Sequence, residues 1–263
     1  MTRIKTGICA LTLAFAASTG AAHADSLSPT FDTFGPLPDA TFGGTGIPND
    51  SVAISTTTDA FFGSTVTLGL TAHQRYDNPP LTNDGAGTFT ALPGSSTPPG
   101  SSEGALWNFA YYIEIADALQ APISAYTFEL LYDFDPGENT PESELGRISF
   151  DLVGFEQQGG ALLEDSQNLM FGFLADDSLP GVDPPAYAAF DPDAAGEYSF
   201  GLRAYFDPTL EGTGDLVAES STQVNVVPTA IPTPVAGLAG LVAFGMLSLR
   251  RSRRDQSLAT LEA

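Results

Sequence analysis

A dense run of carboxylates follows one predicted strand, in the order Asp-Phe-Asp-Pro-Gly-Glu. Asp133, Asp135 and Glu138 supply these carboxylates, and we call residues 133–139 the Asp133 loop. Calcium takes roughly six to eight oxygen ligands, and Asp and Asn oxygens that lie close together suit it. The glycine falls one position too early for an EF-hand, and no flanking helices are predicted. The loop therefore suggests calcium as a cofactor, and solvated turn residues are the alternative.

A second polar group lies where a predicted strand ends, in the order His-Gln-Arg-Tyr. His73 is the single histidine after residue 24, and Arg75 is one of three arginines between residues 25 and 234. These side chains could form a binding cluster for a sugar or an anion. Alternatively, Arg75 pairs with one of the many carboxylates and His73 caps the strand end, because buried polar groups usually satisfy one another.

The residue inventory excludes several kinds of catalysis. Residues 25–234 contain no cysteine, no lysine and one histidine. Cysteine–histidine catalysis, a zinc site with several histidines and a lysine Schiff base are therefore excluded, and a serine triad would need His73. A glycosidase with two carboxylates stays open, because spacing in sequence does not determine distance in space. The inventory favours a protein that is not an enzyme and has no catalytic residues.

The charge balance restricts the partners. Residues 25–234 carry 30 acidic residues against three arginines, a net charge of −27. Such a charge argues against binding to nucleic acid or anionic lipid. It suits solubility, cation binding or a saline habitat in which salt screens self-repulsion. The same segment has no cysteine, so its stability must come from burial and not from disulfides.

Alternation of apolar and polar residues predicts an all-β chain, since a period of two is the period of a strand. Residues Gly160–Asn168 are the one stretch for which a short helix is predicted. The pattern over residues 25–227 indicates a β-sandwich, Ig-like or jelly-roll-like. The predicted strands are Ser51–Thr57, Ser64–Ala72, Ala105–Ile115, Ser124–Phe134, Gly146–Phe155, Leu169–Leu174, Gly196–Phe206 and Leu216–Val227.

Three of these strands carry large apolar residues on one face. In Ala105–Ile115 the aromatic side chains could instead form an exposed platform for carbohydrate, but alternation at this spacing favours a core strand. We therefore expect one group of residues to fill the space between two sheets: Trp107, Phe109, Phe128, Leu130, Phe200 and Leu202.

The first 24 residues have the features of a secretory signal peptide. Arg3 and Lys5 precede an apolar run, Ile8–Ala17, and small residues follow it. Ala22 and Ala24 form the A-x-A site, so cleavage is expected before Asp25.

The other end of the chain combines a proline motif, an apolar segment and a basic cluster. The uncharged run Val235–Leu249 spans roughly 22 Å as a helix, and arginines after it would hold that end in the cytoplasm. We expect a sorting signal over residues 228–254, made of the proline motif, a transmembrane helix and the arginine cluster, then a cytoplasmic tail over residues 255–263. The motif and cluster residues are Val227, Pro228, Ile231, Pro232, Thr233, Pro234, Arg250, Arg251, Arg253 and Arg254.

This order of segments resembles the PEP-CTERM class of exported bacterial proteins, including its VPLPA-CTERM variant. Thr233 stands where that class usually has Glu or Leu. The stretch TAHQRYDNP…NDGAGTF, with IPND before it, resembles uncharacterised members whose cargo has no known activity. The resemblance implies an exosortase-like processing enzyme as partner, an inner-membrane intermediate, and delivery to the cell surface or an exopolysaccharide matrix.

Together these features predict an exported surface or matrix protein, non-enzymatic and associated with exopolysaccharide or biofilm. The alternative is a module that binds or cleaves carbohydrate. Aromatic side chains exposed beside Arg75 or the Asp133 loop would favour that alternative, and aromatic side chains that are all buried would favour the first prediction.

Overall fold

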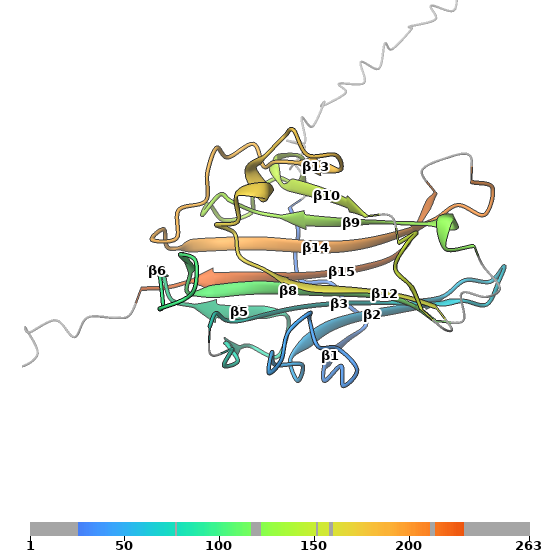
Figure 1. Cartoon of the computed structure of the whole chain (residues 1–263), viewed down its shortest axis with the longest axis horizontal. Helices are drawn as coiled ribbons and strands as arrows, with labels where there is room; N and C mark the ends of the chain where they lie inside the picture. The colour runs from blue at the N-terminus through green and yellow to red at the C-terminus, as the bar shows by residue number, and fades with distance from the viewer. Residues whose placement is uncertain are drawn as a thin grey trace, which may run out of the picture.

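Strands with alternating residues build two facing sheets in the computed structural model (Figure 1). The structure describes residues 26–228, except residues 77, 117–121, 151, 158–159 and 211–213. Apart from strands, the described residues form three short 3-10 helices: η1 (Ile123–Ala125), η2 (Glu142–Glu144) and η3 (Gly172–Ala175). The all-β prediction is confirmed.

The first sheet has six strands, and all its neighbours run antiparallel. Its centre is formed by β3 and β8, which pair over ten residues. In spatial order the strands are β1 (Thr33–Gly35), β2 (Val52–Thr58), β3 (Thr65–Gln74), β8 (Trp107–Ala116), β12 (Gly160–Gln167) and β11 (Glu156–Gln157).

The second sheet has seven strands and is antiparallel except where β15 pairs with β5. A separate hairpin joins β6 (Ser95–Ser96) to β7 (Gly104–Ala105). In spatial order the second sheet contains β13 (Val182–Asp183), β10 (Gly146–Phe150), β9 (Tyr126–Tyr132), β14 (Gly196–Phe206), β15 (Asp215–Val226), β5 (Thr88–Ala91) and β4 (Thr82–Asn83).

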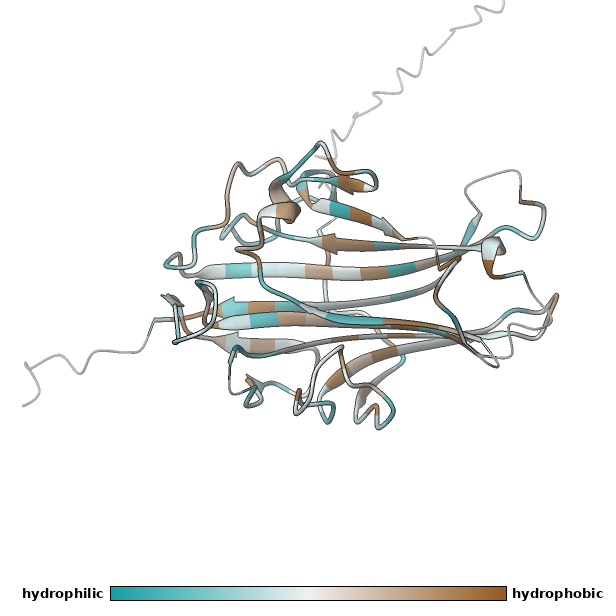
Figure 2. Ribbon diagram, in the orientation of Figure 1, coloured by the Kyte–Doolittle hydropathy of each residue, from teal (hydrophilic) through white to brown (hydrophobic). Residues whose placement is uncertain are grey.

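The core lies between the two sheets, which gives the molecule a sandwich-like character. The Phe109 and Phe200 rings, from opposite sheets, stack with centroids 4.5 Å apart. Figure 2 shows hydrophobic bands within the strands, separated by paler and hydrophilic ones. The predicted core is confirmed, because each of its six residues is at most 2% exposed: Trp107, Phe109, Phe128, Leu130, Phe200 and Leu202.

The outer face of the first sheet is also covered. A second apolar cluster packs Phe42 and Val52 against Tyr112 of β8. Gly69 of β3 is closely covered here, since a Cβ would lie 2.9 Å from Leu37 Cδ2 and 3.1 Å from Val52 Cγ1. The central strands are therefore buried on both faces. Alternation of apolar and polar residues in the sequence predicts only one buried face.

Two predicted elements are wrong. Residues Gly160–Gln167 form strand β12 and not a helix, because every one of them pairs with β8. Residues Leu169–Leu174 were predicted as a strand, but a turn and then η3 occupy this stretch. Leu169 and Leu174 are buried all the same, so the apolar run reflects burial and not a strand.

The expected targeting segments lie almost wholly outside the described residues. These include Ala22, Ala24, Asp25, Ile231–Pro234 and the arginines at 250, 251, 253 and 254. Val227 and Pro228 are described and are exposed just after β15. Within residues 26–228 as described, no helix is long and apolar enough to cross a membrane.

Candidate functional site

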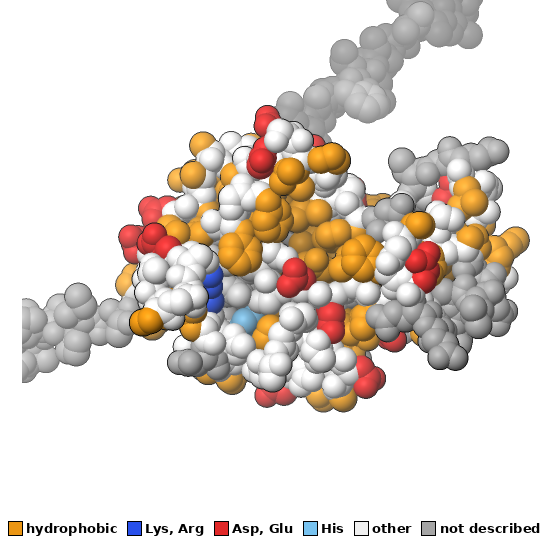
Figure 3. Space-filling model, in the orientation of Figure 1, with side chains coloured by type: hydrophobic (Ala, Val, Ile, Leu, Met, Phe, Trp, Pro, Cys, Tyr) orange, Lys and Arg blue, Asp and Glu red, His pale blue; other side chains and the backbone are white. Residues whose placement is uncertain are grey.

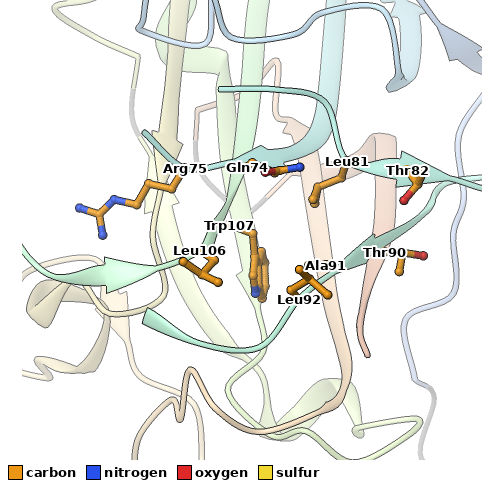
Figure 4. Close-up of a pocket in the computed structure, with 9 residues that line it drawn as sticks. All are labelled: Gln74, Arg75, Leu81, Thr82, Thr90, Ala91, Leu92, Leu106 and Trp107. Atoms are coloured by element: carbon orange, nitrogen blue, oxygen red, sulfur yellow. The ribbon is translucent and has the colours of Figure 1, made fainter. Parts of the chain in front are cut away.

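Residues far apart in sequence meet at the end of the sandwich where β3 ends and β8 begins, which we call the Arg75 end. The backbone N–H of Arg75 donates to Leu106 O at 2.9 Å, and that of Gly94 donates to Pro192 O at 2.6 Å. Arg75 and Leu106 also line a cavity of about 340 Å³. It is lined by Gln74, Arg75, Leu81, Thr82, Thr90, Ala91, Leu92, Leu106 and Trp107, none of them acidic (Figure 4).

The guanidinium of Arg75 lies beside this cavity, between two aromatic rings. Its Cζ is 4.8 Å from the centroid of the Tyr76 ring and 5.6 Å from that of Phe171. Nη2 lies 3.3 Å from Ser102 Oγ and 3.5 Å from Ser102 O, both long for hydrogen bonds. Nη1 is buried and makes no hydrogen bond with a described residue. In Figure 4 the guanidinium points away from Trp107, so the Arg75 stem lines the cavity.

Two local features hold the guanidinium in this position. A Cβ on Gly104 would lie 0.9 Å from Arg75 Nη1, so a larger residue there would displace the guanidinium from this position. Tyr76 has a φ of +76°, a left-handed conformation that is strained for a bulky residue. Its hydroxyl donates to Ser96 O, which fixes the ring against Arg75. The left-handed backbone of Tyr76 therefore accompanies the placement of its ring beside the Arg75 guanidinium.

The other two arginines in the described chain are paired with carboxylates. Arg203 donates to both carboxylate oxygens of Glu142 and to Glu219, and these hydrogen bonds raise its pKa. Arg147 Nε lies 3.6 Å from Glu129 Oε1. No described carboxylate lies within 4.0 Å of the Arg75 guanidinium. The expected pairing of Arg75 with a carboxylate is therefore not found among the described residues.

His73 belongs to a buried polar network below the cavity. Its Nδ1 lies 2.8 Å from Gln74 O, and its Nε2 lies 2.8 Å from Ser166 Oγ. Burial lowers the pKa of His73, which favours the neutral ring. A carbonyl oxygen can only accept, so Nδ1 carries the proton and Nε2 accepts from the Ser166 hydroxyl. Asn108 Nδ2 donates to the same hydroxyl at 2.9 Å, so the network joins β3, β8 and β12.

Ser166 and His73 have the hydrogen bond of a nucleophilic pair but lack the access that such a pair needs. His73 is 1% exposed, and its second nitrogen bonds to a main-chain carbonyl and not to a carboxylate. Residues Gly100–Gly104 fit the G-x-S-x-G pattern, but the central Ser102 contacts Arg75 from a loop and not from a strand-to-helix turn. The network is best explained as structural.

The Asp133 loop is built from short local hydrogen bonds. Asp133 Oδ1 accepts from the Asp135 N–H, and Asp135 Oδ1 accepts from the Gly137 N–H, each at 2.8 Å. Burial raises the pKa of Asp133 to about 6. The described residues hold no group of three or more His, Cys, Asp or Glu that could bind a metal, and Glu138 is exposed. Calcium at this loop stays a prediction that depends on main-chain oxygens for its remaining ligands.

No protein-family model, curated protein or solved structure matches this chain. The site is therefore defined by its geometry. Sequence reasoning singled out Arg75 but missed Ser102, Gly104 and Phe171, which contact its guanidinium and are distant in sequence. The one local signal is the glycine and serine content of residues 93–104, which by itself is typical of a loop.

Proposed function

We propose that the chain is an exported, non-enzymatic protein of the cell surface or extracellular matrix, with the all-β domain as its cargo. One observation carries the proposal: the described domain ends with β15 at Val226, where the proline motif begins. An exosortase-like enzyme would act near Ile231–Pro234 on an inner-membrane intermediate. The charge of −27 on residues 25–234 supports a solvated role in a matrix.

Fractionation tests this proposal. We expect deletion of residues 228–263 to release a soluble product, because the sorting signal is then lost, while the intact chain passes through the membrane fraction. The mass of the product in each fraction shows whether cleavage occurs near Pro234. Deletion of residues 255–263 alone is the matched control and should change little. Identical fractionation of the intact and 228–263-deleted chains would remove the sorting role.

A carbohydrate-binding module is the second candidate, and one observation favours it. Phe173 is 36% exposed, and its ring centroid lies 6.2 Å from that of Phe171, which contacts Arg75. Figure 3 shows hydrophobic side chains gathered around a hollow on the flank over β9, β14 and β12. The platform interpretation of Trp107 and Phe109 is wrong, because both are buried. No carboxylate lines the described cavity, so nothing there favours cleavage.

The assignment to an Ig-like or jelly-roll-like sandwich is also a proposal. Two mainly antiparallel sheets around one core support it. The parallel pairing of β15 with β5 is the feature to check, because it joins the last strand to an early one. An experimental structure with a different strand order would overturn the assignment.

A further inference from the structure

Arg75 is a cation for which the described chain supplies no counter-ion. We propose that the Arg75 end binds an acidic sugar: the guanidinium binds the carboxylate of a uronate unit, and the adjoining cavity takes the neighbouring neutral sugar. The inference rests on the proposed function, because an exopolysaccharide would supply this ligand.

The Arg75 guanidinium makes no short, charge-assisted hydrogen bond with a carboxylate among the described residues. Arginine presents a planar set of donors that matches a carboxylate, and such charge-assisted bonds are shorter than about 3 Å. Arg75 Nη2 instead makes contacts of 3.3 and 3.5 Å with Ser102. The Tyr76 and Phe171 rings stabilise the cation from its faces but accept no hydrogen bond in its plane. A ligand carboxylate would supply a stronger acceptor for Nη2, whereas Nη1 is buried against Gly104.

The cavity has the chemistry of a neutral sugar site. Leu81, Leu92 and Leu106 give it apolar walls, which suit the C–H face of a sugar ring. Gln74, Thr82 and Thr90 add uncharged donors and acceptors for hydroxyl groups. Its volume of about 340 Å³ falls in the range of small-molecule sites. In Figure 4 the Arg75 stem and Leu106 lie at one margin of the cavity, and the guanidinium lies beyond that margin, where the next sugar of a chain would be placed.

The charge of the rest of the domain restricts the ligand further. A polymer with a carboxylate on every unit would be repelled by a domain of net charge −27. Screening at physiological salt limits this repulsion to about 8 Å, so a single carboxylate next to the guanidinium is tolerated. The structure therefore favours a polysaccharide in which uronate units are separated by neutral sugars.

The test measures binding of single-carboxylate disaccharides to the purified full-length chain in mild detergent. The probes are glucuronate, galacturonate and mannuronate, each linked to glucose, together with the uncharged disaccharide of two glucose units and with acetate. We expect calorimetry to find at least one uronate disaccharide bound about tenfold or more tightly than the uncharged one. Arg75→Gln should abolish this preference, while Arg147→Gln should keep it, because Arg147 is paired with Glu129.

A second pair of variants tests the cavity without touching the core. Leu92 lines the cavity and Leu216 lies at the opposite end of the sandwich, and each is 50% exposed. Leu92→Asp should weaken uronate binding about fivefold or more by adding a carboxylate to the site. Leu216→Asp adds the same charge elsewhere and should have little effect.

Three results would overturn the inference: equal affinity for all disaccharides, unchanged binding by Arg75→Gln, or acetate bound as tightly as the uronates. These results are independent of the sorting test, because they use purified protein. If the chain binds uronates but deletion of residues 228–263 does not change its fractionation, this inference stands and the proposed function is wrong. A chain that is sorted as proposed but binds no uronate disaccharide does the reverse.

Discussion

Asp59 and Asp133 are both buried aspartates at opposite ends of β9, because Asp59 contacts Tyr126 at its start and Asp133 follows Tyr132 at its end. The carboxylate of Asp59 accepts from the Tyr126 hydroxyl at 2.6 Å and from the N–H groups of Phe61, Phe62 and Ser64. Burial alone would raise the pKa of Asp59, but these hydrogen bonds together lower it. Asp133 Oδ1 accepts from the Asp135 N–H, and hydrogen bonds from Thr140 and Ser199 also favour the charged form of Asp133, but burial is the larger effect and raises its pKa.

The two ends of the sandwich differ in how completely their buried polar atoms are hydrogen-bonded. Among the described residues, four buried side-chain atoms lack a hydrogen bond, and three of them lie at the Arg75 end: Arg75 Nη1, Asp133 Oδ2 and Gln167 Oε1. Buried polar groups are usually satisfied, because an unmade hydrogen bond costs about 1–3 kcal/mol. These three atoms are buried, and of their residues only Arg75 lines the described cavity.

The first prediction concerns Trp107, which lines the cavity at the Arg75 end and also packs in the core. Its ring lies 5.8 Å from Tyr198 and 6.0 Å from Phe200, and it is 2% exposed. Trp107→Ala should therefore reduce the free energy of unfolding by roughly 3–5 kcal/mol, measured by urea denaturation. Leu92→Ala is the exposed control from the same cavity and should change stability little. A stable Trp107→Ala chain that no longer binds sugar would move this residue from the core to the site.

The second prediction concerns Asp59, whose carboxylate accepts hydrogen bonds from three N–H groups and one hydroxyl. Asp59→Ala leaves three N–H groups and the Tyr126 hydroxyl without their acceptor, so we expect a loss of roughly 3 kcal/mol in the free energy of unfolding. The stabilisation should be present above the ordinary aspartate pKa of 3.8 and be lost as the pH falls through the lowered folded-state value. Asp177→Ala, at an exposed aspartate, is the control. Equal effects of the two variants would contradict the assignment.

The charged carboxylate of Asp133 should destabilise the fold, whereas that of Asp59 stabilises it. The folded-state pKa of Asp133, about 6, lies above the ordinary value of 3.8, so the unfolded chain loses this proton first as the pH rises. The charged carboxylate therefore destabilises the fold above pH 6 by roughly 2–3 kcal/mol, and the cost vanishes below the ordinary value. Asp133→Asn should raise the melting temperature at pH 8 and not at pH 3.5, at fixed ionic strength. A lower melting temperature for the variant at pH 8 would show that Asp133 is stabilised by a partner such as calcium.

Arg75 should have the smallest effect on stability. With the described residues its guanidinium makes only long hydrogen bonds and Nη1 makes none, so Arg75→Gln should change the free energy of unfolding by no more than about 0.5 kcal/mol. Arg203→Gln is the matched variant and should cost more, because it breaks bonds to Glu142 and Glu219. If both variants lose the same stability in urea, Arg75 is a structural arginine like Arg203.

The sequence by itself determined the all-β class, the core and the charge. Alternation is a local property, since successive side chains of a strand point to opposite faces, and it placed Phe128 and Phe200 in the core correctly. The sequence also shows that residues 25–234 contain no lysine and no cysteine. The helix predicted for Gly160–Asn168 failed because pairing with β8 overrides the local preference of that stretch.

Only the tertiary structure decided which polar groups are satisfied. The acceptor for Tyr126 is Asp59, 67 residues away, and Arg75 meets Ser102 across 27 residues. Asp59 and Asp133 look alike in sequence, since each follows a strand of alternating residues. Their pKa values move in opposite directions because hydrogen bonds and burial depend on distances in space, which neither composition nor periodicity contains.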